Sequence, residues 1–118
     1  MKITSYRDLT VWQKAMRLVK AVYDLTSMFP KSELYTLTSQ IRRSAISIAS
    51  NIAEGKARGT RKDYRHFLLN AYGSWAELET QIEISKQLPF NKELNFKEID
   101  GLLDETMRML NVLISKLK

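Results

Sequence analysis

Five basic side chains gather within ten consecutive positions of this 118-residue sequence, in the stretch SNIAEGKARGTRKDYRHF that spans residues 50–67. They are Lys56, Arg58, Arg61, Lys62 and Arg65, and Asp63 is the one acidic residue among them. Arginine and lysine at this density suit phosphate groups, which they bind by charge-assisted hydrogen bonds. A helix that starts near Arg61 adds free main-chain N–H groups and the positive end of its dipole. The stretch therefore predicts contacts with nucleic-acid phosphates, and nothing in it predicts the recognition of particular bases.

Two aromatic residues of the same stretch, Tyr64 and Phe67, admit two interpretations. Aromatic rings beside basic residues can stack on the bases of a single strand. Tyr64, however, continues an apolar stripe with helical spacing, and Phe67 flanks that stripe. We therefore expect both rings to be buried.

Catalytic chemistry finds no support in the residue types present. Gly55 and Gly59 are four positions apart rather than five, no Lys-Ser/Thr pair follows, and a helix rather than a strand precedes them, so a nucleotide-binding P-loop is excluded. His66 is the single histidine, which leaves no Glu-x-x-His pair for a di-metal site and no base-and-orienter set for a nucleophile. There is no cysteine. We expect no enzyme activity, no cofactor, no metal and no small-molecule substrate.

Four further charged residues are candidates for an interface or for ion pairs. Arg42 and Arg43 form a basic pair in the middle of a predicted helix, and Glu77 and Glu79 lie on the next one. A solvated, paired helix surface explains the glutamates most simply. Either glutamate would also suit an arginine of a neighbouring helix or subunit.

The net charge of +6 is distributed unevenly along the chain. Up to Gly59 there are ten basic and four acidic residues, and from Thr60 onward there are nine of each. Such asymmetry fits an anionic partner such as RNA or DNA, and it also fits a charged surface that only keeps the protein soluble. No segment has the length of apolar sequence needed for a membrane span or a secretory signal, so a cytoplasmic protein without a membrane partner is expected.

Apolar residues recur at steps of three and four almost throughout, and no segment alternates with period two. The pattern predicts an all-α single domain over residues 1–118, an up-down-up-down antiparallel four-helix bundle. Its helices are expected at about 9–29, 33–57, 61–88 and 96–117. Helix starts are predicted at Thr10 with Gln13, at Thr60 with Asp63 and at Asn95 with Glu98, three pairs with the spacing of N-terminal caps.

The first predicted helix carries two adjacent apolar stripes. The second of them consists of Leu9, Trp12, Met16, Val19 and Tyr23. Such a width leaves two alternatives open, a helix that lies deep in the bundle or a bundle that associates with further copies of itself.

Three segments, RDLTVWQKAMRLV, FPKSELYTLTSQIRRSAISIASNIAEG and DYRHFLLNAYGSWAELETQ, resemble in this order the 23S ribosomal RNA intervening-sequence protein family. The resemblance covers the chain up to about Leu88 and implies a four-helix bundle that assembles into a ring-shaped homopentamer. A related branch contains the accessory variability determinants of diversity-generating retroelements, which are basic pentamers that bind nucleic acid and partner a reverse transcriptase. No catalytic residue is implied. The recurring sequence motifs of the family include ten positions of this chain, most of which we interpret as serving fold and assembly. They are Gln40, Arg42, Arg43, Asn51, Glu54, Gly55, Gly73, Ser74, Glu77 and Glu79.

Two functions follow as hypotheses from these observations. The first is a non-catalytic, homo-oligomeric protein that binds RNA or DNA through phosphate contacts. The alternative is an adaptor that recruits a protein partner such as a reverse transcriptase, with no direct role in nucleic-acid binding.

Overall fold

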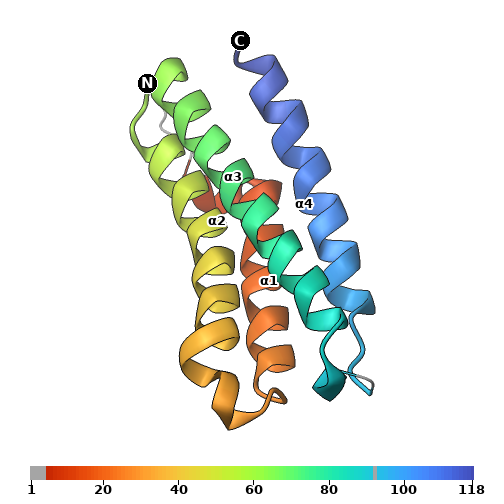
Figure 1. Cartoon of the computed structure of the whole chain (residues 1–118). Coiled ribbons are helices and arrows are strands. Elements are labelled where there is room, and N and C mark those ends of the chain that lie inside the picture. Colours follow the sequence, from red (N-terminus) through yellow and green to blue (C-terminus); the bar gives the residue numbers. More distant parts are fainter. Residues whose placement is uncertain (1–4, 92) are drawn as a thin grey trace.

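The structure is a computed structural model that describes residues 5–91 and 93–118. Its main helices are α1 (Thr10–Thr26), α2 (Ser39–Ala57), α3 (Arg61–Lys86) and α4 (Lys97–Lys116). A short helical turn, η1 (Tyr6–Asp8), precedes α1, and three more lie between the main helices, η2 (Lys31–Glu33), η3 (Leu34–Thr38) and η4 (Pro89–Asn91). Consecutive main helices run in opposite directions (Figure 1). The predicted all-α antiparallel four-helix bundle is confirmed, and the described ranges hold no strand.

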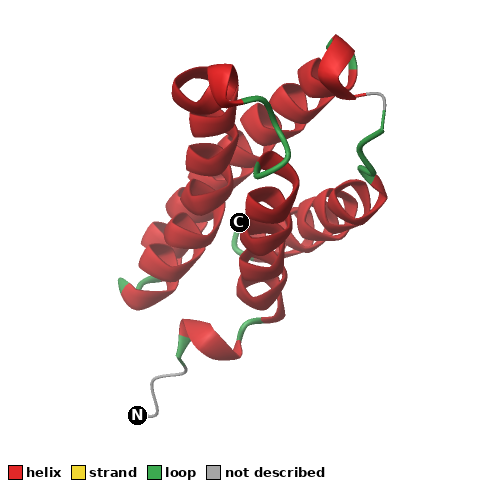
Figure 2. Ribbon diagram, turned by 90° about the horizontal axis from the view of Figure 1, so that it is seen from below, coloured by secondary structure: helices red, strands yellow, loops and turns green. Residues whose placement is uncertain are grey.

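Each helix packs on two neighbours. α1 lies against α2 and α4, and α3 lies against the same two helices, with α2 and α3 forming the most extensive pair. The domain is elongated, with extents of 52 × 22 × 19 Å. In a view from below, the turn that joins α1 to α2 and the connection that joins α3 to α4 lie at different sides of the bundle (Figure 2). The pair α1–α2 therefore packs on the pair α3–α4, and the outer surfaces of the two pairs lie on different sides of the bundle.

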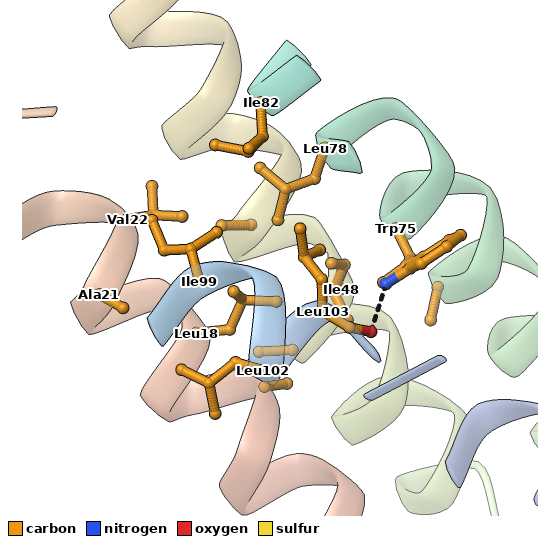
Figure 3. Close-up of a cluster of buried hydrophobic side chains, with 14 of the residues drawn as sticks. Leu18, Ala21, Val22, Ile48, Trp75, Leu78, Ile82, Ile99, Leu102 and Leu103 are labelled. Carbon is orange, nitrogen blue, oxygen red and sulfur yellow. Dashed lines mark hydrogen bonds between the residues drawn. The ribbon is translucent and has the colours of Figure 1, made fainter. Parts of the chain in front are cut away.

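The core is built from one apolar stripe of each helix, as the sequence predicts. Leu18, Ile48 and Leu78 have no exposed surface, and Leu103 of α4 packs among them (Figure 3). Removing a side chain of this size from water contributes about 2 kcal/mol to folding. The four-three spacing of the stripes is what turns these residues inward together.

The second stripe of α1 remains partly at the surface. Met16 is 45% exposed and Tyr23 is 41% exposed, whereas Trp12 and Val19 are half-buried. Seven other residues of α1 are buried, so the two alternatives for this wide apolar face, a helix deep in the bundle and a bundle that self-associates, both stay predictions. An apolar strip on the α1–α2 side remains available for a further contact.

The predicted helix starts are met to different degrees. Thr60 caps α3, because its Oγ1 accepts a hydrogen bond from the main-chain N–H of Asp63 at 3.1 Å. The predicted cap of Asn95 with Glu98 is displaced: Phe96 is the N-cap of α4, and Asn95, one residue earlier, accepts a hydrogen bond from the main-chain N–H of Lys97 at 2.9 Å.

The predicted capping pair of Thr10 and Gln13 is wrong. Leu9 is the N-cap of α1, and the Gln13 side chain donates instead to the main-chain oxygen of Arg7 at 2.9 Å. The reason is that the turn η1 leads directly into α1, so Gln13 satisfies a carbonyl of that turn. Ser5 caps η1, because its side chain accepts a hydrogen bond from the main-chain N–H of Arg7.

The second predicted helix is not regular from residue 33. A turn of 3-10 helix and then a turn of π-helix, η2 and η3, precede α2. The wider π turn buries Thr38 but leaves Tyr35 90% exposed. Turns of this kind are rare and occur frequently at functional sites.

Candidate nucleic-acid interface

The basic stretch forms the hairpin between α2 and α3. Gly59 has a φ of 83°, in the left-handed region that terminates helices, and follows the C-cap Arg58. Thr60 then opens α3, so the connection is three residues long. The adjacent residues Gly59 and Thr60, directly after a helical segment, therefore account for the tight hairpin. This hairpin brings all five basic residues to one end of the bundle.

Close packing of α2 on α3 holds this hairpin in place. A Cβ atom at Gly55 would lie 2.7 Å from the Cβ of Phe67 and 3.2 Å from the main-chain oxygen of Tyr64. Glycine is therefore needed for the approach of the two helices. Tyr64 and Phe67 are half-buried at this contact, and burial raises the pKa of the Tyr64 phenol. The expectation that both rings are buried is met in part.

Two of the five basic residues are engaged by neighbours. The Nη2 of Arg58 lies 2.8 Å from Oε2 of Glu54, and the guanidinium lies over the Phe67 ring at 5.0 Å. The hydrogen bond to Glu54 raises the pKa of Arg58 further above its ordinary value. Lys56 lies over the Tyr64 ring with its Nζ at 5.3 Å from the centroid. These contacts hold both cations on the α2 side of the hairpin and partly offset the charge of Arg58.

The other three basic residues line a groove between the start of α3 and the end of α4. The groove has a volume of about 490 Å³, and its lining consists of Arg61, Lys62, Arg65, His66, Leu69, Leu117 and Lys118. Four of these side chains are cationic, and no Asp or Glu side chain lines the groove in the described part of the chain. The lining thus combines positive charge with two leucines.

Two contacts define how the arginines of this groove are held. An Nη2 hydrogen of Arg61 is donated to the main-chain oxygen of Lys116, so Arg61 caps the last turn of α4. The Nε of Arg65 is buried and has no hydrogen-bond partner among the described residues. Lys62 is exposed. Lys62 and Arg65 are therefore the groove cations whose hydrogen-bonding capacity is least used by the fold.

The second candidate set is dispersed over the bundle. Arg42 lies at the α1–α2 contact, where its Nε donates to Oγ1 of Thr26 at 2.8 Å and its guanidinium lies 4.4 Å from the centre of the Tyr23 ring. Arg43 is exposed one position further on. Arg42 thus joins two helices by a hydrogen bond and a cation–π contact, and no ion pair of Arg42 occurs in the described ranges.

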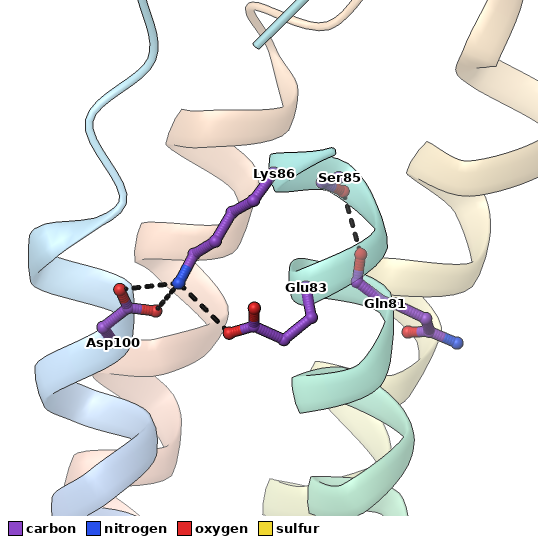
Figure 4. Close-up of polar contacts among 5 residues, drawn as sticks. All are labelled: Gln81, Glu83, Ser85, Lys86 and Asp100. Atoms are coloured by element: carbon purple, nitrogen blue, oxygen red, sulfur yellow. Dashed lines mark hydrogen bonds and ion pairs between the residues drawn. The ribbon is translucent and has the colours of Figure 1, made fainter. Parts of the chain in front are cut away.

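Glu77 and Glu79 are both exposed on α3, and neither forms an ion pair within residues 5–91 and 93–118. The expected pairing of the α3 surface is present one turn later. The Nζ of Lys86 lies 3.2 Å from Glu83 and 2.9 Å from Asp100 (Figure 4). The hydrogen bond to Asp100, together with that to Glu83, raises the pKa of Lys86. The roles of Arg43, Glu77 and Glu79 in an interface stay predictions.

The sequence did not point to four residues of the groove, His66, Leu69, Leu117 and Lys118. Lys116 at the end of α4 is 55 positions away from Arg61 at the hairpin, so the lysines of that end stand apart from the basic cluster in the sequence. The one usable signal is topological, because antiparallel order places the end of a fourth helix beside the start of the third.

The fold and the groove together define a small all-α bundle with a basic end. No group of acidic, histidine and cysteine residues able to hold a metal occurs among the described residues, and no helix in that part of the chain is long and apolar enough to cross a membrane. The model of the 23S rRNA-intervening sequence protein family matches residues 7–112. The chain belongs to this family, as the three sequence segments indicate.

A solved structure supports the fold. It is the 1.70 Å crystal structure of a protein with unknown function from the S23 ribosomal protein family of Bacteroides thetaiotaomicron VPI-5482. The TM-score is 0.72 at 21% sequence identity, and the match covers 92% of this chain and 99% of the other. No curated protein matches this chain. The name of this family and that of the solved structure's family do not denote enzymes.

Proposed function

We propose that this protein is a non-catalytic, homo-oligomeric protein that binds RNA or DNA through phosphate contacts at its basic end. One observation carries the proposal, the groove of Arg61, Lys62, Arg65 and Lys118, which no Asp or Glu side chain of residues 5–91 and 93–118 lines. Four cations that face one open groove repel each other unless an anion lies between them. A phosphodiester backbone supplies such anions at regular spacing.

The contacts available in the groove are suited to phosphate rather than to base edges. Lys62 acts as an exposed point charge, and Arg65 offers a planar set of donors that fits two phosphate oxygens. Arg61 already holds the end of α4, so its contribution to binding is electrostatic. Binding with little dependence on nucleotide sequence follows from contacts of this kind.

Self-association is the second part of the proposal. The exposed part of the α1 apolar stripe supports it, together with the exposed Leu34 and Tyr35 of η3 and Ile46 of α2. A ring of five copies is the assembly that family resemblance suggests, and it would bring several basic ends to one face. Many weak phosphate contacts would then act together on one nucleic acid.

Fluorescence anisotropy with a labelled RNA and a labelled DNA tests the nucleic-acid part. Affinity is expected to fall steeply with salt, with the slope of log affinity against log salt concentration equal to about 0.7 to 0.9 per phosphate contact. An absence of binding at low salt would overturn it. A protein partner that is retained from cell extract after nuclease treatment and at high salt, a reverse transcriptase included, would favour the adaptor hypothesis instead.

A further inference from the structure

The α1–α2 side of the bundle carries a groove that is basic and aromatic. It has a volume of about 460 Å³ and is lined by Tyr23, Leu34, Tyr35, Thr38, Ser39, Arg42, Arg43 and Ile46. No acidic side chain lines it in the described part of the chain. Tyr35 is 90% exposed at its mouth because of the π turn, and Arg42 is fixed on Tyr23. Tyrosine and arginine are enriched in protein interfaces, so this lining is typical of a contact surface.

The α3–α4 side carries a groove of opposite charge. Its volume is about 250 Å³, and its lining consists of Trp75, Glu79, Glu83, Lys86, Asp100, Leu103, Asp104 and Met107. Four of these residues are acidic and one is basic. Lys86 is shared by Glu83 and Asp100 (Figure 4), and Asp104 pairs with Arg108. Glu79 therefore stands at an acidic groove without an ion-pair partner among the described residues.

The two grooves lie at the same height along the bundle. The hydroxyls of Ser47 and Ser74 meet at 2.8 Å, which fixes the register of α2 against α3. In an antiparallel pair each step up one helix matches a step down the other, so Arg43 lies near the level of Leu78. Glu79 is at that level on α3, on the side that faces α4.

The grooves also lie on different sides. The helices follow one another around the bundle in chain order, so the outer surface of the α1–α2 pair and the outer surface of the α3–α4 pair lie on different sides of the bundle. One copy can thus present its basic groove to the acidic groove of a second copy. A contact between two different patches is head-to-tail, and it closes into a ring only when successive copies do not rise along the axis. Equal heights of the two grooves favour a contact without such a rise, and the rotation between successive copies then decides whether they close into a ring or form an open row.

We propose that a second copy of this chain occupies the α3–α4 groove, with its Arg43 against Glu79 and its Tyr35 beside the apolar floor of Trp75 and Met107. The inference rests on the self-association part of the proposed function. An arginine and a carboxylate form two parallel hydrogen bonds in such a contact, which gives it orientation as well as attraction. The pairing also uses the charged positions for which the fold of one copy provides no partner.

Multi-angle light scattering on the full chain and its charge-reversal variants tests this pairing. The variants R43E and E79R each place like charges in the contact. Each is expected to lower the mass of the assembly to that of a dimer or a monomer. The double variant R43E/E79R restores the opposite charges in exchanged positions and is expected to regain the wild-type mass. Lys31→Glu, an exposed reversal outside both grooves, is the control and should keep the wild-type mass.

The outcomes separate this inference from the proposed function. Rescue by the double variant could not come from a chain that fails to fold, so it would support the pairing directly. Single variants that keep the wild-type mass, or a double variant that stays dissociated, would overturn the pairing while leaving self-association intact. A wild-type chain that is monomeric would overturn both the pairing and the self-association, and the nucleic-acid titration would stand independently.

Discussion

The indole nitrogen of Trp75 donates a hydrogen bond to the main-chain oxygen of Leu103 at 2.8 Å, and it joins α3 to α4 near the middle of the bundle (Figure 3). Trp75 is buried, so its N–H requires a partner inside the protein. The bond sets where α4 lies along α3. It thereby helps to place both the acidic groove beside Trp75 and the end of α4 beside the basic hairpin.

Replacing this indole is expected to destabilise the bundle. In Trp75→Phe the hydrogen bond to Leu103 is lost and a void remains, for a combined loss of about 1 to 3 kcal/mol. Urea unfolding followed by circular dichroism measures the difference. Trp12→Phe is the matched control, since Trp12 is only half-buried and should cost less. Equal losses in the two variants would contradict the role of the Trp75 bond.

Gly55 and Gly73 are expected to respond to alanine in opposite directions. At Gly55 the added methyl group meets Phe67 at 2.7 Å, so the helices must separate, at a cost of about 1 to 3 kcal/mol. At Gly73 nothing lies within 4 Å of the added atom, and alanine should stabilise the helix by about 0.5 to 1 kcal/mol. Thermal and urea unfolding of the two variants give the comparison. A stabilised Gly55→Ala chain would show that the α2–α3 approach does not require glycine.

The hydroxyl of Tyr64 makes the folding stability depend on pH in the alkaline range. It is buried without a hydrogen-bond partner among the described residues, and burial raises the pKa of the phenol. The unfolded phenol loses its proton near pH 10, while the folded one still keeps it. Folding stability is therefore expected to fall as pH rises above about 10, because only the unfolded state gives up this proton there.

Tyr64→Phe removes this contribution. The variant should equal the wild type or exceed it by up to about 1 kcal/mol at pH 7, since an unpaired buried hydroxyl is lost. Above pH 10 the unfolding free energy of the variant should exceed that of the wild type by a growing amount. Unfolding free energies across this range are the measurement, with Tyr35→Phe as the exposed control. An advantage that shrinks with rising pH would contradict the buried, unpaired phenol.

The helices were predictable because each has an apolar stripe with helical spacing and clear ends. Thr60 with Asp63 and Gly59 mark the hairpin in the sequence as they do in the structure. The start of α1 was not predictable, because η1 satisfies Gln13 through a carbonyl that only the folded turn provides. The π turn before α2 leaves no trace in a periodicity of three and four either.

The candidate site was predictable only as a local cluster. Lys56, Arg58, Arg61, Lys62 and Arg65 are adjacent in the sequence, but side-chain contacts divide them. Arg58 turns to Glu54, whereas Arg65 faces the groove with α4. A division of this kind depends on which neighbour lies closest in three dimensions. The same holds for Lys118, which joins the site from the far end of the chain.

The salt dependence of nucleic-acid binding by the variant Lys62→Gln/Arg65→Gln tests the central claim most directly. Both side chains line the basic groove, and neither carries an ion pair among the described residues. If each neutralises one phosphate, the slope of log affinity against log salt should decrease by about 1.4 to 1.8 relative to the wild type. The matched control Lys31→Gln/Lys97→Gln removes two exposed cations at the other end of the bundle and should leave the slope unchanged. Equal slopes for the groove variant and the wild type would contradict the assignment of phosphate binding to this groove.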